Sequence, residues 1–139
     1  MGKVYQGITK ITAIIMVNGS AKNYQRGQWA EQIVLDYLVR EKLKLLSRNF
    51  HGSRGEIDLI MLDSETIVFI EVRYRVNNNY LNALETINEK KCSRIIKTSQ
   101  QYLQANRWTS NSPCRFDVIT VTGESETPEI VWIKNAFQA

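Results

Sequence analysis

Two acidic residues lie inside apolar segments of this 139-residue chain, where an ionised side chain needs a compensating partner. Asp58 stands in the apolar segment 57–62, and Glu71 stands in the apolar segment 67–72. A carboxylate taken out of water costs several kcal/mol of free energy unless a cation or hydrogen-bond donors compensate it. The pattern therefore indicates a pair of carboxylates that holds a divalent metal ion, because hard divalent ions favour oxygen ligands.

The turn between the two segments decides whether these carboxylates meet. Side chains alternate between the two faces of a strand, so Glu56 and Asp58 share one face. If residues 63–66 close a hairpin with a two-residue loop, Asp58 lies opposite Glu71, with Cβ atoms about 5 Å apart. The loop Ser64-Glu65 lacks the Gly or Asn that such turns favour, and an odd-length loop without a bulge would place the acids on opposite faces.

Other polar residues could complete a site around this pair. Glu31 lies at the edge of the apolar stripe of a predicted helix, from where it could reach the same metal. Arg73 shares a face with Glu71 and could neutralise charge on a transferring phosphoryl group, while Arg75 could bind a neighbouring phosphate. The structural alternatives are a solvated Glu31, an ion-pair ladder of Glu71 with Arg73 or Arg75, and a Glu56 that pairs with a nearby arginine.

Two helices and five strands are expected to position these residues. The predicted helices span residues 24–42, with Asn23 as N-cap, and 87–106. The predicted strands span residues 43–50, 56–62, 66–75, 115–121 and 129–134. The strands are almost continuously apolar, which indicates that helices cover both faces of the sheet. The order of the predicted helices and strands along the chain is therefore that of a mixed α/β domain.

The second predicted helix carries a basic stripe opposite its apolar face. The inward face is expected to hold Cys92, Ile95, Ile96, Ser99 and Leu103. Lys90, Arg94 and Lys97 recur at helical spacing on the other side, with Lys91 beside them. Such a stripe is most often a solvated helix face, but next to a metal site it becomes a candidate track for a nucleic-acid backbone.

Composition favours a polyanionic partner and argues against zinc. Eighteen basic and fourteen acidic residues give a net charge of +4. Cys92 and Cys114 have no ligand-like spacing and only His51 to join them, so we expect two free thiols in a reducing cytoplasm.

The N-terminal residues 1–22 are expected to be a loosely ordered extension of a single domain that spans residues 23–139. The apolar run 11–17 is too short to span a bilayer, so no membrane contact is expected. With Lys3 and Lys10 before it, the run has some features of a signal peptide, and translation from Met16 is the alternative.

Several motifs of the chain together carry a family resemblance. They are Gly27 with Glu31, Arg48-Asn49, the segments 55–60 and 68–75, Lys91, and the segments 115–118 and 132–137. With these motifs the chain resembles the YraN family of small bacterial proteins, and is identified as a member of it. That family is similar to Holliday-junction resolvases and to the wider restriction-endonuclease-like PD-(D/E)xK nuclease superfamily.

The resemblance implies a restriction-endonuclease-like fold, with a central mixed sheet flanked by helices in the order αβββαββ. It matches Asp58 to the first metal-binding aspartate of the superfamily, Glu71 to the acid of its E-x-K element, and Glu31 to the helix glutamate of resolvase-like members. Arg73 stands where that element has lysine. Because arginine stays charged, Arg73 could orient water or stabilise charge but could not accept a proton.

The resulting hypothesis is a metal-dependent endonuclease that hydrolyses phosphodiester bonds in DNA, including branched DNA, and acts as a homodimer like the resolvases. Mg²⁺ or Mn²⁺ would be held by Asp58, Glu71 and the main-chain carbonyl of Val72, with Glu31 acting directly or through water. Glu56 would lie beside these ligands. Residues expected to bind nucleic acid are Arg75, Lys90, Lys91, Arg94 and Lys97. The alternatives are a nucleic-acid-binding module that has no turnover and a domain that binds an acidic protein.

Overall fold

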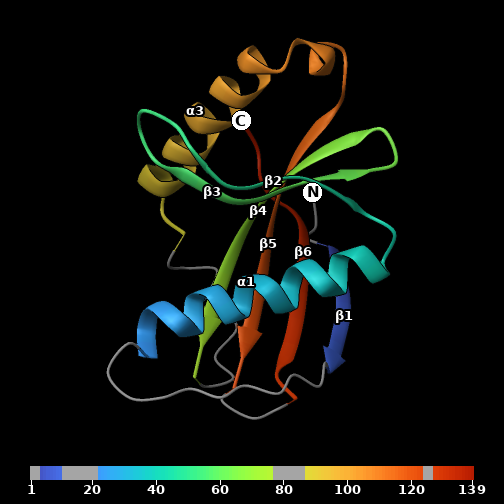
Figure 1. Ribbon diagram of the computed structural model, residues 1–139, viewed down its shortest axis with the longest axis vertical. Helices are drawn as coiled ribbons and strands as arrows, with labels where there is room; N and C mark the ends of the chain where they lie inside the picture. The colour runs from blue at the N-terminus through green and yellow to red at the C-terminus, as the bar shows by residue number, and fades with distance from the viewer. Residues whose placement is uncertain (1–3, 11–21, 77–86, 124–126) are drawn as a thin grey trace.

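A computed structural model describes residues 4–10, 22–76, 87–123 and 127–139. These residues form a six-stranded mixed sheet in the order β1-β6-β5-β4-β3-β2 (Figure 1). The helices are α1 (Lys22–Arg40) and α3 (Glu89–Ala105), followed by a short 3₁₀ turn, η2 (Arg107–Thr109). The strands are β1 (Val4–Lys10), β2 (Lys44–His51), β3 (Glu56–Asp63), β4 (Thr66–Arg75), β5 (Cys114–Thr122) and β6 (Glu129–Phe137). The predicted mixed α/β class is confirmed.

The first strand was not expected. Residues 1–22 were predicted to be a loosely ordered extension, whereas Val4–Lys10 forms β1 and pairs antiparallel with β6. The pairing covers the edge of β6, whose backbone donors and acceptors would otherwise face solvent. The apolar run 11–17 and Met16 lie outside the described residues. Among the helices that are described, none is long and apolar enough to cross a membrane.

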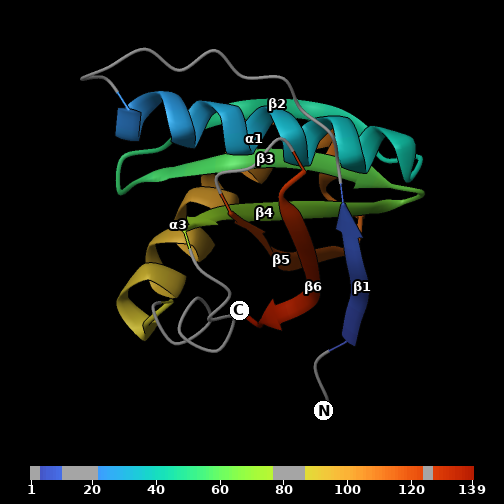
Figure 2. The same cartoon turned by 90° about the horizontal axis from the view of Figure 1, so that it is seen from below.

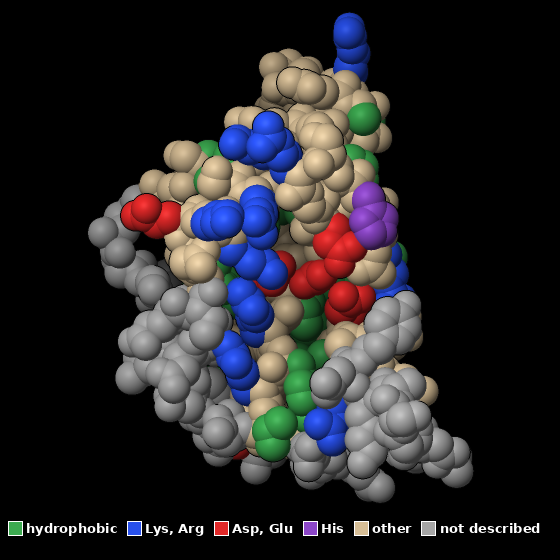
Figure 3. Space-filling model, turned by 90° about the vertical axis from the view of Figure 1, so that its left-hand side faces the viewer, with side chains coloured by type: hydrophobic (Ala, Val, Ile, Leu, Met, Phe, Trp, Pro, Cys, Tyr) green, Lys and Arg blue, Asp and Glu red, His purple; other side chains and the backbone are tan. Residues whose placement is uncertain are grey.

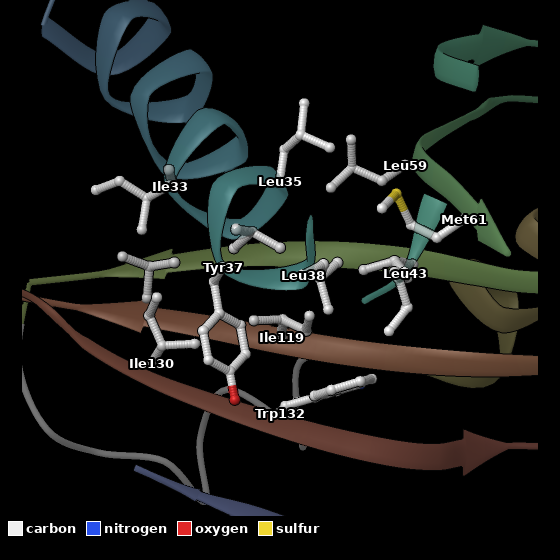
Figure 4. Packing of buried hydrophobic residues seen from close by; sticks show 14 of the residues in the cluster. Ile33, Leu35, Tyr37, Leu38, Leu43, Leu59, Met61, Ile119, Ile130 and Trp132 are labelled. Atoms are coloured by element: carbon white, nitrogen blue, oxygen red, sulfur yellow. The ribbon is translucent and has the colours of Figure 1, made fainter. Parts of the chain in front are cut away.

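Helix α1 covers one face of the sheet and α3 covers the other (Figure 2). The apolar stripe of α1 packs on side chains from β3, β4, β5 and β6, and Tyr37 meets Trp132 edge to face at 6.1 Å between ring centroids (Figure 4). The helix begins at Lys22, so Asn23 lies in its first turn and is not the N-cap. The helix ends at Arg40, and Lys42, in the turn that follows, adopts a left-handed φ of 74°.

The inward face of α3 differs in part from the predicted one. Ile95 and Ser99 are buried as expected, but Thr98 and Tyr102 join them, while the remaining predicted residues are only partly covered. Thr98 can be buried because its hydroxyl donates to the carbonyl of Arg94 at 2.8 Å. The helix begins after Asn88, whose side chain accepts a hydrogen bond of 2.9 Å from the backbone N–H of Lys91.

The hairpin of β3 and β4 has the predicted register. Asp63 pairs with Thr66 across a two-residue loop, and the ladder continues to the pair Leu59 and Ile70. Ser64 supplies the turn geometry that Gly or Asn would favour, by adopting a φ of 55°. The next strand, β5, runs parallel to β4 along its whole length. The residues of β4 from Ile67 to Glu71 are buried, as expected for a sheet covered on both faces.

Candidate active site

The two central strands separate at one end of their shared ladder. Their last paired residues are Leu59 and Ile70. Beyond this pair β3 stays on β2 as far as Glu56, while β4 stays on β5 as far as Arg75. We call this place, formed by residues 56–58 of β3 and 71–75 of β4, the fork. Asp58 and Glu71 are the first residues of the fork and lie opposite each other in the register of the hairpin.

Asp58 lies across the opening of the fork. Its Oδ2 atom accepts a hydrogen bond of 2.9 Å from the backbone N–H of Val72, a donor that has left the β3–β4 ladder. Burial raises the pKa of Asp58 to about 8, and the charge of nearby Glu71 is the second cause. The bond from Val72 lowers the pKa but does not cancel these two effects. Negative charge at Asp58 is therefore under-compensated.

Glu71 is buried among cations. Its side chain is 7% exposed, and its Oε1 atom lies 2.8 Å from Nζ of Lys91 on α3. Nε of Arg73 lies 3.5 Å from the same oxygen and has no hydrogen-bond partner. Arg73 thus occupies the face predicted for it, but Lys91 is the cation that binds Glu71 closely. Sequence reasoning had placed Lys91 only on the nucleic-acid track.

Glu31 reaches the fork from the opposite helix, α1. Burial raises the pKa of Glu31, and side-chain hydrogen bonds with Asn49 and Asp58 lower it. Two ionised carboxylates cannot hydrogen-bond to each other. The contact of Glu31 with Asp58 therefore needs a proton shared by the two side chains, or a cation between them instead of the proton. The three acids that were predicted to gather are therefore neighbours, with Asp58 between the other two.

Glu56 lies at the rim of the fork and pairs with His51. The distance from His51 Nδ1 to Glu56 Oε2 is 3.1 Å, and both side chains are largely exposed. Glu56 also raises the pKa of Glu31 through its charge. The pairing with Arg54 or Arg73 that was considered from the sequence is not the ion pair that the structure has.

The basic residues of α3 lie beside the acids on one face of the molecule. Figure 3 shows a row of lysine and arginine side chains next to a cluster of acidic ones. Lys90, Arg94 and Lys97 are exposed, as a solvent-facing stripe requires, whereas Lys91 turns to Glu71. Arg75 is partly buried at the end of β4. Cations and acids predicted from the sequence thus share one surface.

This chain is similar to known proteins over the residues that form this site. Residues 30–121 match the model of a family described as "Uncharacterised protein family UPF0102". This segment contains Glu31, Asp58, Glu71 and Lys91. The chain belongs to the UPF0102 family. This is the YraN family, so the family predicted from the sequence is confirmed.

UPF0102 proteins similar to this chain occur in several bacteria. A UPF0102 protein of Nitrosococcus oceani is 43% identical over 118 residues, which cover 85% of this chain and 95% of the relative. One of Stutzerimonas stutzeri is 41% identical over 120 residues, covering 86% and 99%. One of Colwellia psychrerythraea is 40% identical over 122 residues, covering 85% and 95%. The similarity therefore extends over nearly the whole length of these relatives.

The side chains of this UPF0102 site fit a divalent ion only with help from the backbone. In the described part of the chain, no three His, Cys, Asp or Glu side chains converge closely enough to hold a metal by themselves. Asp58 and Glu71 offer carboxylate oxygens, and completing a six-ligand set would need the Val72 carbonyl and water. The raised pKa of Asp58 and its contact with Glu31 both favour an added cation at this place.

Asn49 is a site residue of this UPF0102 chain that sequence reasoning missed. It lies inside β2, between the paired residues Arg48 and Phe50, with a φ of 50°, and its side chain hydrogen-bonds Glu31. Asn is among the few residues that adopt this left-handed region readily, so its place in the breaker cluster 49–55 was an available signal. Neighbouring Arg48 donates to Gln32 at 2.9 Å, which joins β2 to α1. Together the two contacts hold Glu31 over the fork.

Proposed function

We propose that this protein is a metal-dependent endonuclease that hydrolyses phosphodiester bonds in DNA. The single observation that carries the proposal is the pair of partly buried Asp58 and buried Glu71 at the fork, where burial and then the charge of Glu71 raise the pKa of Asp58 to about 8. A carboxylate pair in this condition favours a divalent cation. The basic stripe beside it supplies positive charge for a phosphate backbone. The order αβββαββ that follows β1 supports a restriction-endonuclease-like fold.

The residues at the fork would have different roles in hydrolysis. Asp58, Glu71 and the carbonyl of Val72 would hold Mg²⁺ or Mn²⁺, with Glu31 acting directly or through water. When bound, such an ion lowers the pKa of a coordinated water and offsets charge on the phosphate. Arg73 would stabilise negative charge that develops on the phosphate, because its guanidinium lies at the acid pair and stays protonated.

The stripe and Arg75 would orient the substrate. Lys90, Arg94 and Lys97 are exposed on α3 and would contact successive phosphates along one strand. Arg75, at the far end of the fork, would bind a phosphate beyond the scissile one. The resemblance to resolvases favours branched DNA as the substrate and a homodimer as the working unit. The two free cysteines, Cys92 and Cys114, favour the cytoplasm as its location.

A second candidate function is nucleic-acid binding without turnover. The observation that favours it is Arg73, which replaces the lysine expected by resemblance and cannot exchange a proton. In this case the acids would serve as an ion-pair ladder with Lys91 and Arg73. The polar contacts at the fork would then only hold α1 and α3 against the sheet.

One assay separates the two functions. Purified protein is incubated with labelled four-way junction, flap and linear duplex DNA, in buffer with Mg²⁺, Mn²⁺ or EDTA. The endonuclease cleaves at least one substrate with metal, and Asp58→Asn and Glu71→Gln each abolish cleavage. The matched control Asp36→Asn, on the exposed face of α1, leaves cleavage unchanged. Salt-sensitive binding with no cleavage in any condition would refute the endonuclease and favour the binding module.

A further inference from the structure

Lys91 differs from the other cations of α3 in what it touches. Its Nζ atom lies 2.8 Å from Oε1 of Glu71, and its side chain is 41% exposed, so the ammonium bridges the buried acid and solvent. Its charge also acts on Asp58, where it lowers the pKa. Lys90, Arg94 and Lys97 have no ion pair with the acids among the described contacts. Lys91 is therefore part of the acid cluster and part of the basic stripe.

The start of α3 fixes the backbone of Lys91 in this position. The side chain of Asn88 caps the helix by accepting from the N–H of Lys91 at 2.9 Å. The cap holds the backbone, while the four-carbon stem of lysine leaves the ammonium free to change partners. A short rotation of the stem moves the charge from the fork toward the surface that the stripe occupies.

A divalent ion at the acid pair and the ammonium of Lys91 compete for the same oxygen. Glu71 Oε1 already has two cationic neighbours, at 2.8 Å and 3.5 Å. A metal ion that bound this oxygen would repel the ammonium at close range. The released ammonium would then face the phosphates tracked by the stripe.

We propose that Lys91 is an exchangeable counter-ion: it neutralises Glu71 until a divalent metal ion replaces it, and it then binds a phosphate group of the nucleic acid. The proposal rests on the proposed function for the identity of the second ligand. It makes metal and nucleic acid cooperative ligands. A bound metal ion displaces Lys91 from Glu71 and so frees it for phosphate, and a bound phosphate holds Lys91 away from Glu71 and so frees that oxygen for metal. By linkage, the factor by which metal strengthens nucleic-acid binding equals the factor by which nucleic acid strengthens metal binding.

The first experiment titrates Mn²⁺ into the full chain without nucleic acid, by calorimetry. Lys91→Met keeps the length of the side chain and removes its charge, so Mn²⁺ should bind about tenfold more tightly than to the unmodified protein. Lys91→Arg should bind Mn²⁺ as the unmodified protein does or more weakly. The matched control Arg94→Met removes a stripe charge that does not touch Glu71, and should change Mn²⁺ affinity less than threefold.

The second experiment measures binding of a fluorescein-labelled duplex by anisotropy, with and without Ca²⁺ at constant ionic strength. Ca²⁺ should strengthen binding several-fold in the unmodified protein and in Arg94→Met, although Arg94→Met binds more weakly throughout. In Lys91→Met the factor by which Ca²⁺ strengthens duplex binding should be less than half of the factor in the unmodified protein. Circular dichroism of each variant checks that α3 is intact.

The outcomes separate this inference from the proposed function. Equal Mn²⁺ affinity of Lys91→Met and the unmodified protein overturns the exchange, whatever the DNA assays show. A tighter Mn²⁺ site in Lys91→Met supports the competition at Glu71, even if no DNA is cleaved. An equal gain from Ca²⁺ in Lys91→Met and the unmodified protein overturns the transfer of Lys91 to phosphate.

Discussion

Asp58 Oδ2 accepts a hydrogen bond of 2.9 Å from the backbone N–H of Val72, across the point where β3 and β4 part. The carboxylate takes the place of the ladder partner that Val72 loses at the fork. Asp58 therefore has a structural task besides its proposed role at a metal. A substitution that keeps an acceptor oxygen at this position preserves the hydrogen bond from Val72. Asn is therefore the informative replacement for Asp58.

The first prediction concerns the pH dependence of stability. Because the pKa of Asp58 is raised to about 8, the folded state holds a proton that the unfolded chain releases near pH 4. Stability without metal should therefore fall as pH rises from about 4 to about 8. Asp58→Asn removes this loss, and should be more stable than the unmodified protein at pH 8.5 by on the order of 2 kcal/mol. Urea unfolding in EDTA at pH 5 and pH 8.5 measures the difference. An advantage of Asp58→Asn that does not grow with pH contradicts the assigned shift.

The second prediction concerns the strand that supports β4. Asp117 on β5 is fully buried and accepts hydrogen bonds from Arg115, from Trp132 Nε1 at 2.9 Å and from the N–H of Asn135 at 3.1 Å. Asp117→Ala leaves these donors without their acceptor and should destabilise the fold by about 3 to 5 kcal/mol. Urea unfolding measures the loss. Asp36→Ala, on the exposed face of α1, should cost less than about 1 kcal/mol. A loss for Asp117→Ala no greater than the control's would show that this network contributes little.

The third prediction separates Arg73 from the stripe. The guanidinium of Arg73 lies at Glu71, so Arg73→Met should lower the cleavage rate of DNA at least about tenfold. Binding of the same duplex should weaken less than about threefold, because Arg73 is mostly covered beside Glu71 and lies off the exposed stripe. Single-turnover cleavage and anisotropy on the same preparation give both numbers. A parallel loss of binding and cleavage would make Arg73 a part of the backbone track.

The fourth prediction tests the track itself. Lys90→Met and Lys97→Met each remove one exposed charge of α3 and should weaken duplex binding about three- to tenfold. Each should also reduce the slope of log affinity against log salt concentration by about one, which is the signature of a lost phosphate contact. The exposed Arg40 lies at the end of α1, so Arg40→Met is the matched control and should leave the slope unchanged. An unchanged slope in both α3 variants would remove the stripe from the interface.

The sequence was sufficient to predict the hairpin that brings Asp58 and Glu71 together. Length fixed the register, since the loop between Asp63 and Thr66 has room for two residues only. Ser64 shows why residue preferences alone were a poor guide there: the apolar faces of β3 and β4 determine the pairing, and Ser64 accepts a left-handed φ of 55° to allow it. Alternation along β4 likewise placed Arg73 beside Glu71.

Several contacts between distant elements were not predicted from the sequence, although the approach of Glu31 to Asp58 was. Lys91 has the spacing of a solvated stripe, and only the packing of α3 against the sheet brings its ammonium to Glu71. The pairing of β1 with β6 depends on an open edge that no local pattern of residues 4–10 reveals. Thr98 reads as polar and is buried, because its hydroxyl bonds to the backbone of its own helix.

The most direct test of the central claim is anomalous diffraction from crystals of the protein soaked in Mn²⁺. The account predicts one strong peak at the fork, about 2.1 Å from a carboxylate oxygen of Asp58, one of Glu71 and the carbonyl oxygen of Val72. Asp58→Asn crystals, soaked in the same way, should lack the peak. A peak at His51 and Glu56 alone, or no peak at the fork at a Mn²⁺ concentration that supports cleavage, would contradict the account.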